Sequence, residues 1–211
     1  MTLPTNWLAR IRGSLAAAPD HDPARWQIAG QPLATFAGVQ TAMPSTPRAA
    51  AVLVPIIDRA QAPSLLMTTL AGHLRQHAGQ ISFPGGGIEA GDDDVLGAAL
   101  RETQEEIGIE PSYVQPLGFL PDQIVLTGFR ITPVVALVRP GYSLRVDSKE
   151  VAEVFEMPLE YLSHEENFRS TRRVLRGVEV TLKDVHFEGR VVWGATAGML
   201  QMLHAALRRE P

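Results

Sequence analysis

The chain has 211 residues, a formal net charge of −4 at pH 7 and 45% hydrophobic residues, which fits one globular domain with appendages or two small domains. The weakly acidic balance gives no support for nucleic-acid or polybasic membrane-surface binding, so we expect neither partner. No cysteine is present, which excludes disulfides, cysteine-ligated metals and thiol nucleophiles.

The start of the chain lacks the continuous apolar core and the basic residues of a secretory signal. No apolar run approaches the roughly 20 residues that a membrane-spanning helix needs. We therefore expect a cytoplasmic protein, and the sequence leaves a homodimer open.

The first 48 residues predict a helix and an irregular arm that packs on the body of the protein. Residues 5–18 place apolar side chains on one helical face, with Thr5 or Asn6 as the cap. Residues 19–48 are rich in Pro, Ala and Gly and predict no regular element. The apolar face consists of Trp7, Leu8, Ile11 and Leu15. Residues 49–211 are then expected to form the main domain.

The main domain is expected to begin with strands at Ala50–Ile57 and Ser64–Leu70, because both runs are short, apolar and bounded by turn residues. Residues 71–87 predict a loop with a short strand near Ile81–Phe83. A helix from about Asp93 to Ile107 follows, and Gly108 suits its left-handed C-terminal cap.

The rest of the chain returns to strand patterns and ends in a helix. Together these elements predict an α/β fold in which a mixed β-sheet is sandwiched between helices. The expected elements are strands at 114–120, 129–138 and 151–159, a short helix at 158–168, one hairpin formed by 172–182 and 186–194, and a helix at 196–210 whose apolar face carries Met199, Leu200, Leu203 and Leu207.

Three glutamates, Glu102, Glu105 and Glu106, share one face of the predicted 93–107 helix, where like charges repel by a few tenths of a kcal/mol per pair. No lysine or arginine follows any of them at i+4; Arg101, four residues before Glu105, can orient that carboxylate. A solvated helix face is one interpretation. A bound divalent cation is the other, because hard cations take oxygen ligands and leave positions for phosphates.

Glycines and aspartates precede this helix. The run Gly85–Gly87 allows a tight backbone path and close approach of a ligand. Asp92–Asp94 can supply capping carboxylates. Loop, cap and spaced carboxylates within 24 residues are far more specific than a glycine-rich loop alone.

Residues Arg101–Gly108, "RETQEEIG", resemble the Nudix box, R-E-x-x-E-E-x-G. The resemblance implies the Nudix fold with its loop–helix–loop, which holds Mg²⁺ or Mn²⁺ in hydrolases of nucleoside diphosphates linked to another group. The family also has a glutamate in the preceding loop. Counting back from Arg101 places Asp93 there, whereas reading forward from the glycines places Asp92 there.

The stretch Leu65–Gly86 resembles the signature of the coenzyme A pyrophosphatase subgroup. Its second half matches, whereas Met67, Thr69 and Leu70 replace the usual Thr, Arg and Ser. The resemblance implies a small nucleotide substrate of the CoA type. The implied substrate-binding residues are Arg75, Gly79, Phe83, Gly85, Gly86 and Gly87.

The resemblance also implies roles in catalysis. Glu102, Glu105 and Glu106 would ligate the metal, Glu105 and Arg101 would take part in catalysis, and Arg101 would orient a carboxylate. Glu150 is the first candidate for the general base, and Glu153 is the second. With CoA the products would be 3′,5′-ADP and 4′-phosphopantetheine, and Arg75 or Arg48 could contact the 3′-phosphate.

Other interpretations stay open at this stage. The substrate could be ADP-ribose, NADH or a dinucleotide polyphosphate, and a Nudix domain can also serve as a nucleotide-sensing module without catalysis. For His73 and His77, no third ligand supports a zinc site, so surface positions or phosphate contacts are expected. Trp193 is expected in the core, with stacking on adenine as the alternative.

Overall fold

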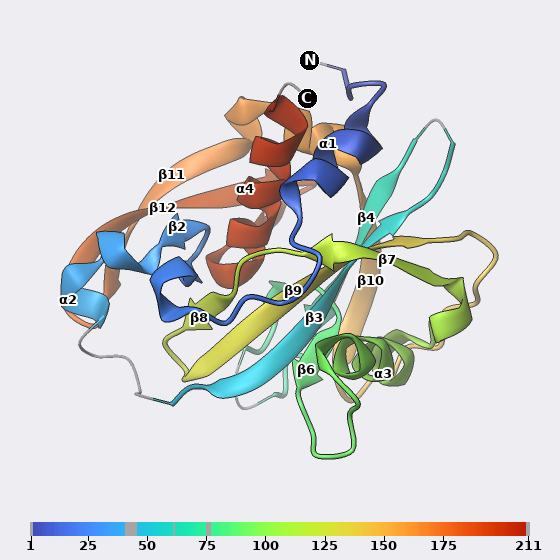
Figure 1. Cartoon of the computed structure of the whole chain (residues 1–211), viewed down its shortest axis with the longest axis horizontal. Coiled ribbons are helices and arrows are strands. Elements are labelled where there is room, and N and C mark those ends of the chain that lie inside the picture. Colours follow the sequence, from blue (N-terminus) through green and yellow to red (C-terminus); the bar gives the residue numbers. More distant parts are fainter. Residues whose placement is uncertain (1, 41–45, 61, 75–76, 210–211) are drawn as a thin grey trace.

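A mixed β-sheet forms the centre of the computed structural model, which describes residues 2–40, 46–60, 62–74 and 77–209 (Figure 1). Strands β3 (Arg48–Ile57) and β9 (Phe129–Val138) lie at its centre and run parallel, in register from Arg48–Phe129 to Ile57–Val138. Both strands are almost continuously apolar, as expected where a strand is covered on both faces. The expected strand at 129–138 has the observed bounds.

Antiparallel strands extend this sheet on both sides. β4 pairs with β3 and β10 pairs with β4, while β7 and β8 both pair with β9. Short β5 and β6 pair with β4 and β3, respectively. The bounds are β4 Ser64–Leu70, β5 Ile81–Ser82, β6 Gly85–Gly87, β7 Val114–Phe119, β8 Gln123–Val125 and β10 Val151–Pro158.

Helices α3 (Val95–Ile107) and α4 (Gly194–Arg208) cover opposite faces of the sheet (Figure 1). Successive side chains of β3 point to opposite faces, so Leu53 packs in the cluster beneath α3 and Val54 in the cluster beneath α4. The predicted sandwich is therefore confirmed. Within the described part of the chain, no helix is long and apolar enough to cross a membrane.

The predicted apolar face of α4 is confirmed, because all four of its expected residues are at most 2% exposed. The predicted short helix at 158–168 is wrong in type. Two 3₁₀ segments, η4 (Leu159–Ser163) and η5 (Glu165–Asn167), occupy this stretch.

A second, three-stranded sheet follows where the sequence predicted one hairpin. Strand β12 (Val178–Phe187) pairs antiparallel with β11 (Phe168–Leu175) on one side and with β13 (Arg190–Val192) on the other. The expected pairing is wrong because each of the two segments predicted as hairpin strands contains a turn of its own, at residues 176–177 and 188–189. All four turn residues have positive φ.

The arm predicted at 19–48 is only partly irregular. Strand β1 (Gln27–Ile28) adds to the central sheet in parallel with β8, and β2 (Gln31–Pro32) pairs with β1. Strands of two residues carry no periodic pattern, which explains why the sequence did not indicate them. The arm also contains η1 (Pro23–Arg25), η2 (Leu33–Thr35) and α2 (Ala37–Gln40), whereas residues 41–45 lie outside the described part.

The N-terminal helix α1 (Trp7–Ser14) lies beside α4 (Figure 1). Arg10 Nη1 donates to the Leu207 carbonyl at 2.8 Å, and Ile11 is fully buried in the cluster that α4 also joins. Nearer the start of α4, Gly198 meets the β1–β2 turn so closely that a Cβ there would lie 2.3 Å from the Gly30 nitrogen. The arm and the sheet are therefore joined through α4.

We expect Gly198→Ala to destabilise the protein by about 1–3 kcal/mol, because the added methyl group would push the β1–β2 turn away from α4. This cost opposes the roughly 1 kcal/mol that alanine gains over glycine inside a helix. Urea denaturation measures the difference. Gly13→Ala in α1 is the matched control: nothing lies within 4 Å of its new methyl group, so that variant should be stabilised.

Candidate active site

Helix α3 is defined by its two caps. The Asp94 carboxylate accepts a hydrogen bond from the Gly97 nitrogen at 2.7 Å, and Gly108 ends the helix in the left-handed conformation with φ 78°. The sequence predicted the glycine cap and an aspartate cap. The structure assigns the capping role to Asp94.

Glu106 is the most buried of the three glutamates, with 5% of its surface exposed. Its Oε2 atom accepts a hydrogen bond from the Gly85 nitrogen at 3.2 Å. Its pKa is raised to about 8, mainly because burial removes water from the charged form; the nearby charges of Glu102 and Glu150 add to this shift, and the hydrogen bond from Gly85 opposes it. The carboxylate is thus held in a place that favours loss of its charge.

Glu102 lies directly against the glycine strand β6. A Cβ on Gly86 would come within 2.5 Å of the Glu102 carboxylate, so a side chain there would displace that carboxylate. Gly85 is restricted more strongly, because its φ is 152° and an added Cβ would lie only 2.3 Å from the Ala51 carbonyl oxygen. A Cβ added at Gly87 would meet nothing within 4 Å. Of the three predicted glycines, Gly85 is therefore the one that backbone conformation and packing require.

Arg101 connects the helix to the preceding loop. Its Nε and Nη2 atoms donate to both oxygens of Asp92 at 2.8 and 3.1 Å, and Nη2 also donates to the Gly87 carbonyl. The arginine lowers the pKa of Asp92 and its own pKa is raised in turn. Of the two candidate loop acids, Asp92 is thus the one that pairs with Arg101.

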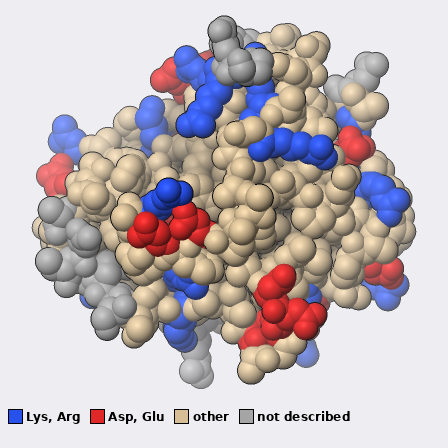
Figure 2. All heavy atoms as spheres, in the orientation of Figure 1, with Lys and Arg blue, Asp and Glu red and all other residues tan. Residues whose placement is uncertain are grey.

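The remaining nitrogen of Arg101 contacts two of the glutamates. Nη1 lies 3.0 Å from Glu102 Oε1 and 3.1 Å from Glu105 Oε2. Burial raises the pKa of Glu102, although the contact with Arg101 opposes this shift. The Glu105 side chain is 61% exposed, and acidic side chains gather over α3 on the surface (Figure 2).

The two candidate bases differ in where they lie. Glu150 belongs to a loop that is bonded to both sides of the site: Asp147 N donates to the Glu106 carbonyl, and Ala71 N donates to the Glu150 carbonyl, both at 2.8 Å. Its charge raises the pKa of Glu102 and Glu106. Glu153, in contrast, pairs with Arg190 at 2.6 Å. The geometry favours Glu150.

The donor chemistry of α3 fits a divalent cation, but the side chains are not arranged around one. Among the described residues, no group of three or more acidic or histidine side chains could hold a metal ion as it stands. Arg101 contacts Glu102 and Glu105, while Glu106 accepts from a backbone nitrogen. Carboxylate oxygens are nevertheless the ligands that Mg²⁺ and Mn²⁺ prefer, and a bound cation would favour the charged form of Glu106 against the effect of its burial.

Three of the predicted substrate-binding residues precede the glycines in the sequence, and each has a different outcome. Arg75 lies outside the described residues. Gly79 forms a turn with φ 68°, and its nitrogen donates to the Leu70 carbonyl. Phe83 is only 1% exposed and packs in the main core, so its ring supports the sheet.

A pocket of about 570 Å³ lies beside the glycine strand and extends to the second sheet and the start of α4. Gly85–Gly87 form one wall, and Trp193 lies on another. The expectation of a core position for Trp193 is wrong: it is 39% exposed at the N-terminal cap of α4, with the Arg173 guanidinium 4.8 Å from its ring. Ile124 and Leu182 of the pocket wall were not predicted as site residues, because the sequence indicated neither strand β8 nor the path of strand β12.

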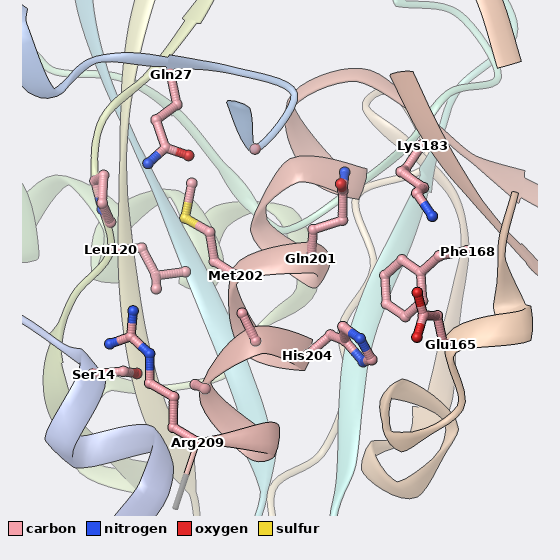
Figure 3. A pocket seen from close by; sticks show the side chains of 14 residues that line it. Ser14, Gln27, Leu120, Glu165, Phe168, Lys183, Gln201, Met202, His204 and Arg209 are labelled. Carbon is pink, nitrogen blue, oxygen red and sulfur yellow. The ribbon is translucent and has the colours of Figure 1, made fainter. Parts of the chain in front are cut away.

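A second cavity, of about 480 Å³, lies elsewhere, between α4, β1 and η5 (Figure 3). Gln27, Lys183 and His204 line it. None of the predicted site residues that the structure describes takes part in it, so it is separate from the carboxylate site.

Comparison with known proteins identifies the family to which the chain is similar. A NUDIX domain model matches residues 47–177. The Nudix hydrolase NudL of Shigella flexneri serotype 5b is 41% identical over 168 residues, or 80% of this chain and 87% of the relative. NudL of Escherichia coli O6:H1 is 42% identical over 164 residues, or 78% and 85% of the two chains. A solved Caenorhabditis elegans Ap4A hydrolase is 21% identical, with a TM-score of 0.44, over 53% of this chain and 80% of that one.

The raised pKa of Glu106 predicts a pH dependence of stability in the metal-free protein. The folded-state pKa of about 8 exceeds the unfolded value of 4.5, so the folded state binds the extra proton. Stability should therefore be greatest below about pH 4.5 as far as this group is concerned, and fall as pH rises through 8, by a total on the order of a few kcal/mol.

Urea denaturation in EDTA at pH 5 and pH 8.5 measures this effect. Glu106→Gln, which mimics the protonated form, should show a smaller loss of stability between the two pH values. Glu105→Gln is the matched control on the exposed part of the same face and should keep the loss. An equal loss in wild type and Glu106→Gln would contradict the assignment.

Proposed function

The chain belongs to the Nudix family, and from that premise we propose that it hydrolyses the pyrophosphate of coenzyme A or a derivative, releasing 3′,5′-ADP and 4′-phosphopantetheine or its acylated form. The observation that carries hydrolysis is the cluster of carboxylates on α3, with Glu106 buried against β6. All three box glutamates are present, which argues against a domain that only senses nucleotides.

The CoA assignment rests on the sequence match between Arg75 and Gly86. The departure at Thr69, where the subgroup usually has arginine, leaves other nucleotides such as ADP-ribose, NADH or a dinucleotide polyphosphate as competitors. Arg48 offers a cation near the pocket, since it is exposed and its guanidinium lies 4.1 Å from the Phe129 ring, and Phe129 lines the pocket. Arg48 is accordingly a candidate contact for the 3′-phosphate, beside Arg75.

In this proposal Glu102, Glu105 and Glu106 hold Mg²⁺ or Mn²⁺. When bound, the ion would neutralise charge on the phosphates and lower the pKa of the attacking water, which would then lose its proton more readily. Arg101 keeps α3 and its carboxylates in place through its two bonds to Asp92. Glu150 accepts the proton from the attacking water, a role consistent with its loop being bonded to α3.

A substrate panel tests the proposal. With Mg²⁺ or Mn²⁺ present, we expect cleavage of CoA at a higher kcat/KM than cleavage of ADP-ribose, NADH or diadenosine polyphosphates, and loss of activity in EDTA. Chromatography of the products would identify 3′,5′-ADP. Turnover of ADP-ribose with CoA left intact would show that the subgroup is wrong.

A pair of variants tests the base. Glu150→Gln should lower kcat by about 10²–10⁴-fold, because general acid–base catalysis contributes that much, and should flatten the acid limb of the pH–rate profile. Glu153→Gln breaks an exposed ion pair with Arg190 and should change kcat little. If Glu153→Gln were the inactive variant, the assignment would have to be reversed.

A further inference from the structure

The second cavity, of about 480 Å³, lies between elements that are far apart in the sequence (Figure 3). Its wall is formed by the end of α1, the β1–β2 arm, the C-terminal half of α4, and η5 with the neighbouring strands of the second sheet. This volume is in the range of pockets that enclose a small metabolite. The cavity is therefore large enough for a ligand of its own.

Two cationic side chains, Lys183 and Arg209, enter the cavity from opposite sides (Figure 3). Among the residues that the structure describes, neither side chain forms a hydrogen bond or a close ion pair. Glu165, an acidic residue of the same wall, pairs with Arg208 at 2.7 Å, and that arginine lies outside the wall. Arg208 is also the main cause of the lowered pKa of Glu165, whereas Lys183 contributes less. The wall thus keeps a positive charge at each of two ends.

Lys183 lies at the edge of the protein core. On one face of β12 it stands between exposed Thr181 and fully buried Val185, which packs in the main core together with α4. Its own side chain is half-buried and lines the cavity. Because an ammonium group that loses water needs a compensating partner, this position favours an anion in the cavity.

Neutral polar side chains line the same wall. The side-chain oxygen of Gln27 is buried and accepts no hydrogen bond from the described residues. Gln201 donates its amide nitrogen to the Ala29 carbonyl at 3.1 Å. His204 Nδ1 donates to the Leu162 carbonyl, so Nε2 is the ring nitrogen that faces other partners. A polar ligand would therefore find hydrogen-bonding groups as well as charge.

We propose that this cavity is a second ligand-binding site, for a small organic molecule that carries two separate anionic groups, one bound by Lys183 and the other by Arg209. The anionic groups are phosphates or carboxylates, because ammonium and guanidinium groups bind both. The described wall shares no residue with the carboxylate site, so this inference does not depend on the proposed function.

Calorimetry on the full-length protein in EDTA tests binding with two matched pairs of probes. Fructose 1,6-bisphosphate is compared with fructose 6-phosphate, and 2-oxoglutarate is compared with butyrate. In at least one pair, the probe with two anionic groups should bind at least ten-fold more tightly than the probe with one. The pair with the larger difference identifies the anionic group as phosphate or carboxylate. Equal affinities within both pairs, or no binding of any probe, would overturn the inference.

Variants of the two cations test the site itself. Lys183→Met and Arg209→Gln should each remove the preference for two anionic groups. Arg209 follows the last residue of α4 and is exposed, so its variant stays informative should Lys183→Met fail to fold. Arg172→Gln is the matched control, because the Arg172 side chain is 83% exposed on β11 and lies outside the wall. Loss of the preference in Arg172→Gln as well would indicate a general effect of charge and contradict a site.

Hydrogen exchange locates the bound probe. The tighter probe should slow amide exchange in residues 27–32 and 165–168, because a ligand in the cavity would hold the arm and η5 against α4. Exchange in α3 should be unchanged. Protection of β6 and α3 in place of these residues would show that the probe binds at the carboxylates, and the inference would fail.

Discussion

Negative charge held against a strand of glycines is the constraint on which the rest of the site depends. Like charges at helical spacing cost only a few tenths of a kcal/mol per pair. Burial has the larger effect, because it is the main cause of the raised pKa of both Glu106 and Glu102. Charge repulsion alone would be compatible with a solvated helix face. A buried carboxylate needs a compensating partner, and the Gly85 nitrogen supplies one hydrogen bond but no positive charge.

The surrounding elements keep this arrangement in place. Strand β6 has no side chains, so the carboxylates of α3 approach its backbone, and the same glycines line the neighbouring pocket. Arg101 and Asp92 tie the loop to the helix, and Asp147 N ties the Glu150 loop to the end of α3. The carboxylates and the pocket are therefore direct neighbours in the fold.

Sequence patterns were informative where a local signal is strong. The ten apolar residues of β9 and the cap at Gly108 follow from burial on both faces and from a left-handed cap position. Strands β1 and β8, of two and three residues, exist because of their partners in the sheet and carry no periodicity of their own. The exposed position of Trp193 depends on how β13 leads into α4, which no residue near Trp193 reveals.

Binding of Mn²⁺ to the protein, followed by electron paramagnetic resonance at pH 8, tests most directly whether the counter-charge of α3 is a metal ion. We predict that wild type binds Mn²⁺, that Glu105→Gln weakens binding by at least ten-fold, and that Glu110→Gln, an exposed change just beyond the helix, leaves it unchanged. Equal Mn²⁺ affinity in wild type and Glu105→Gln would contradict a metal site on this helix.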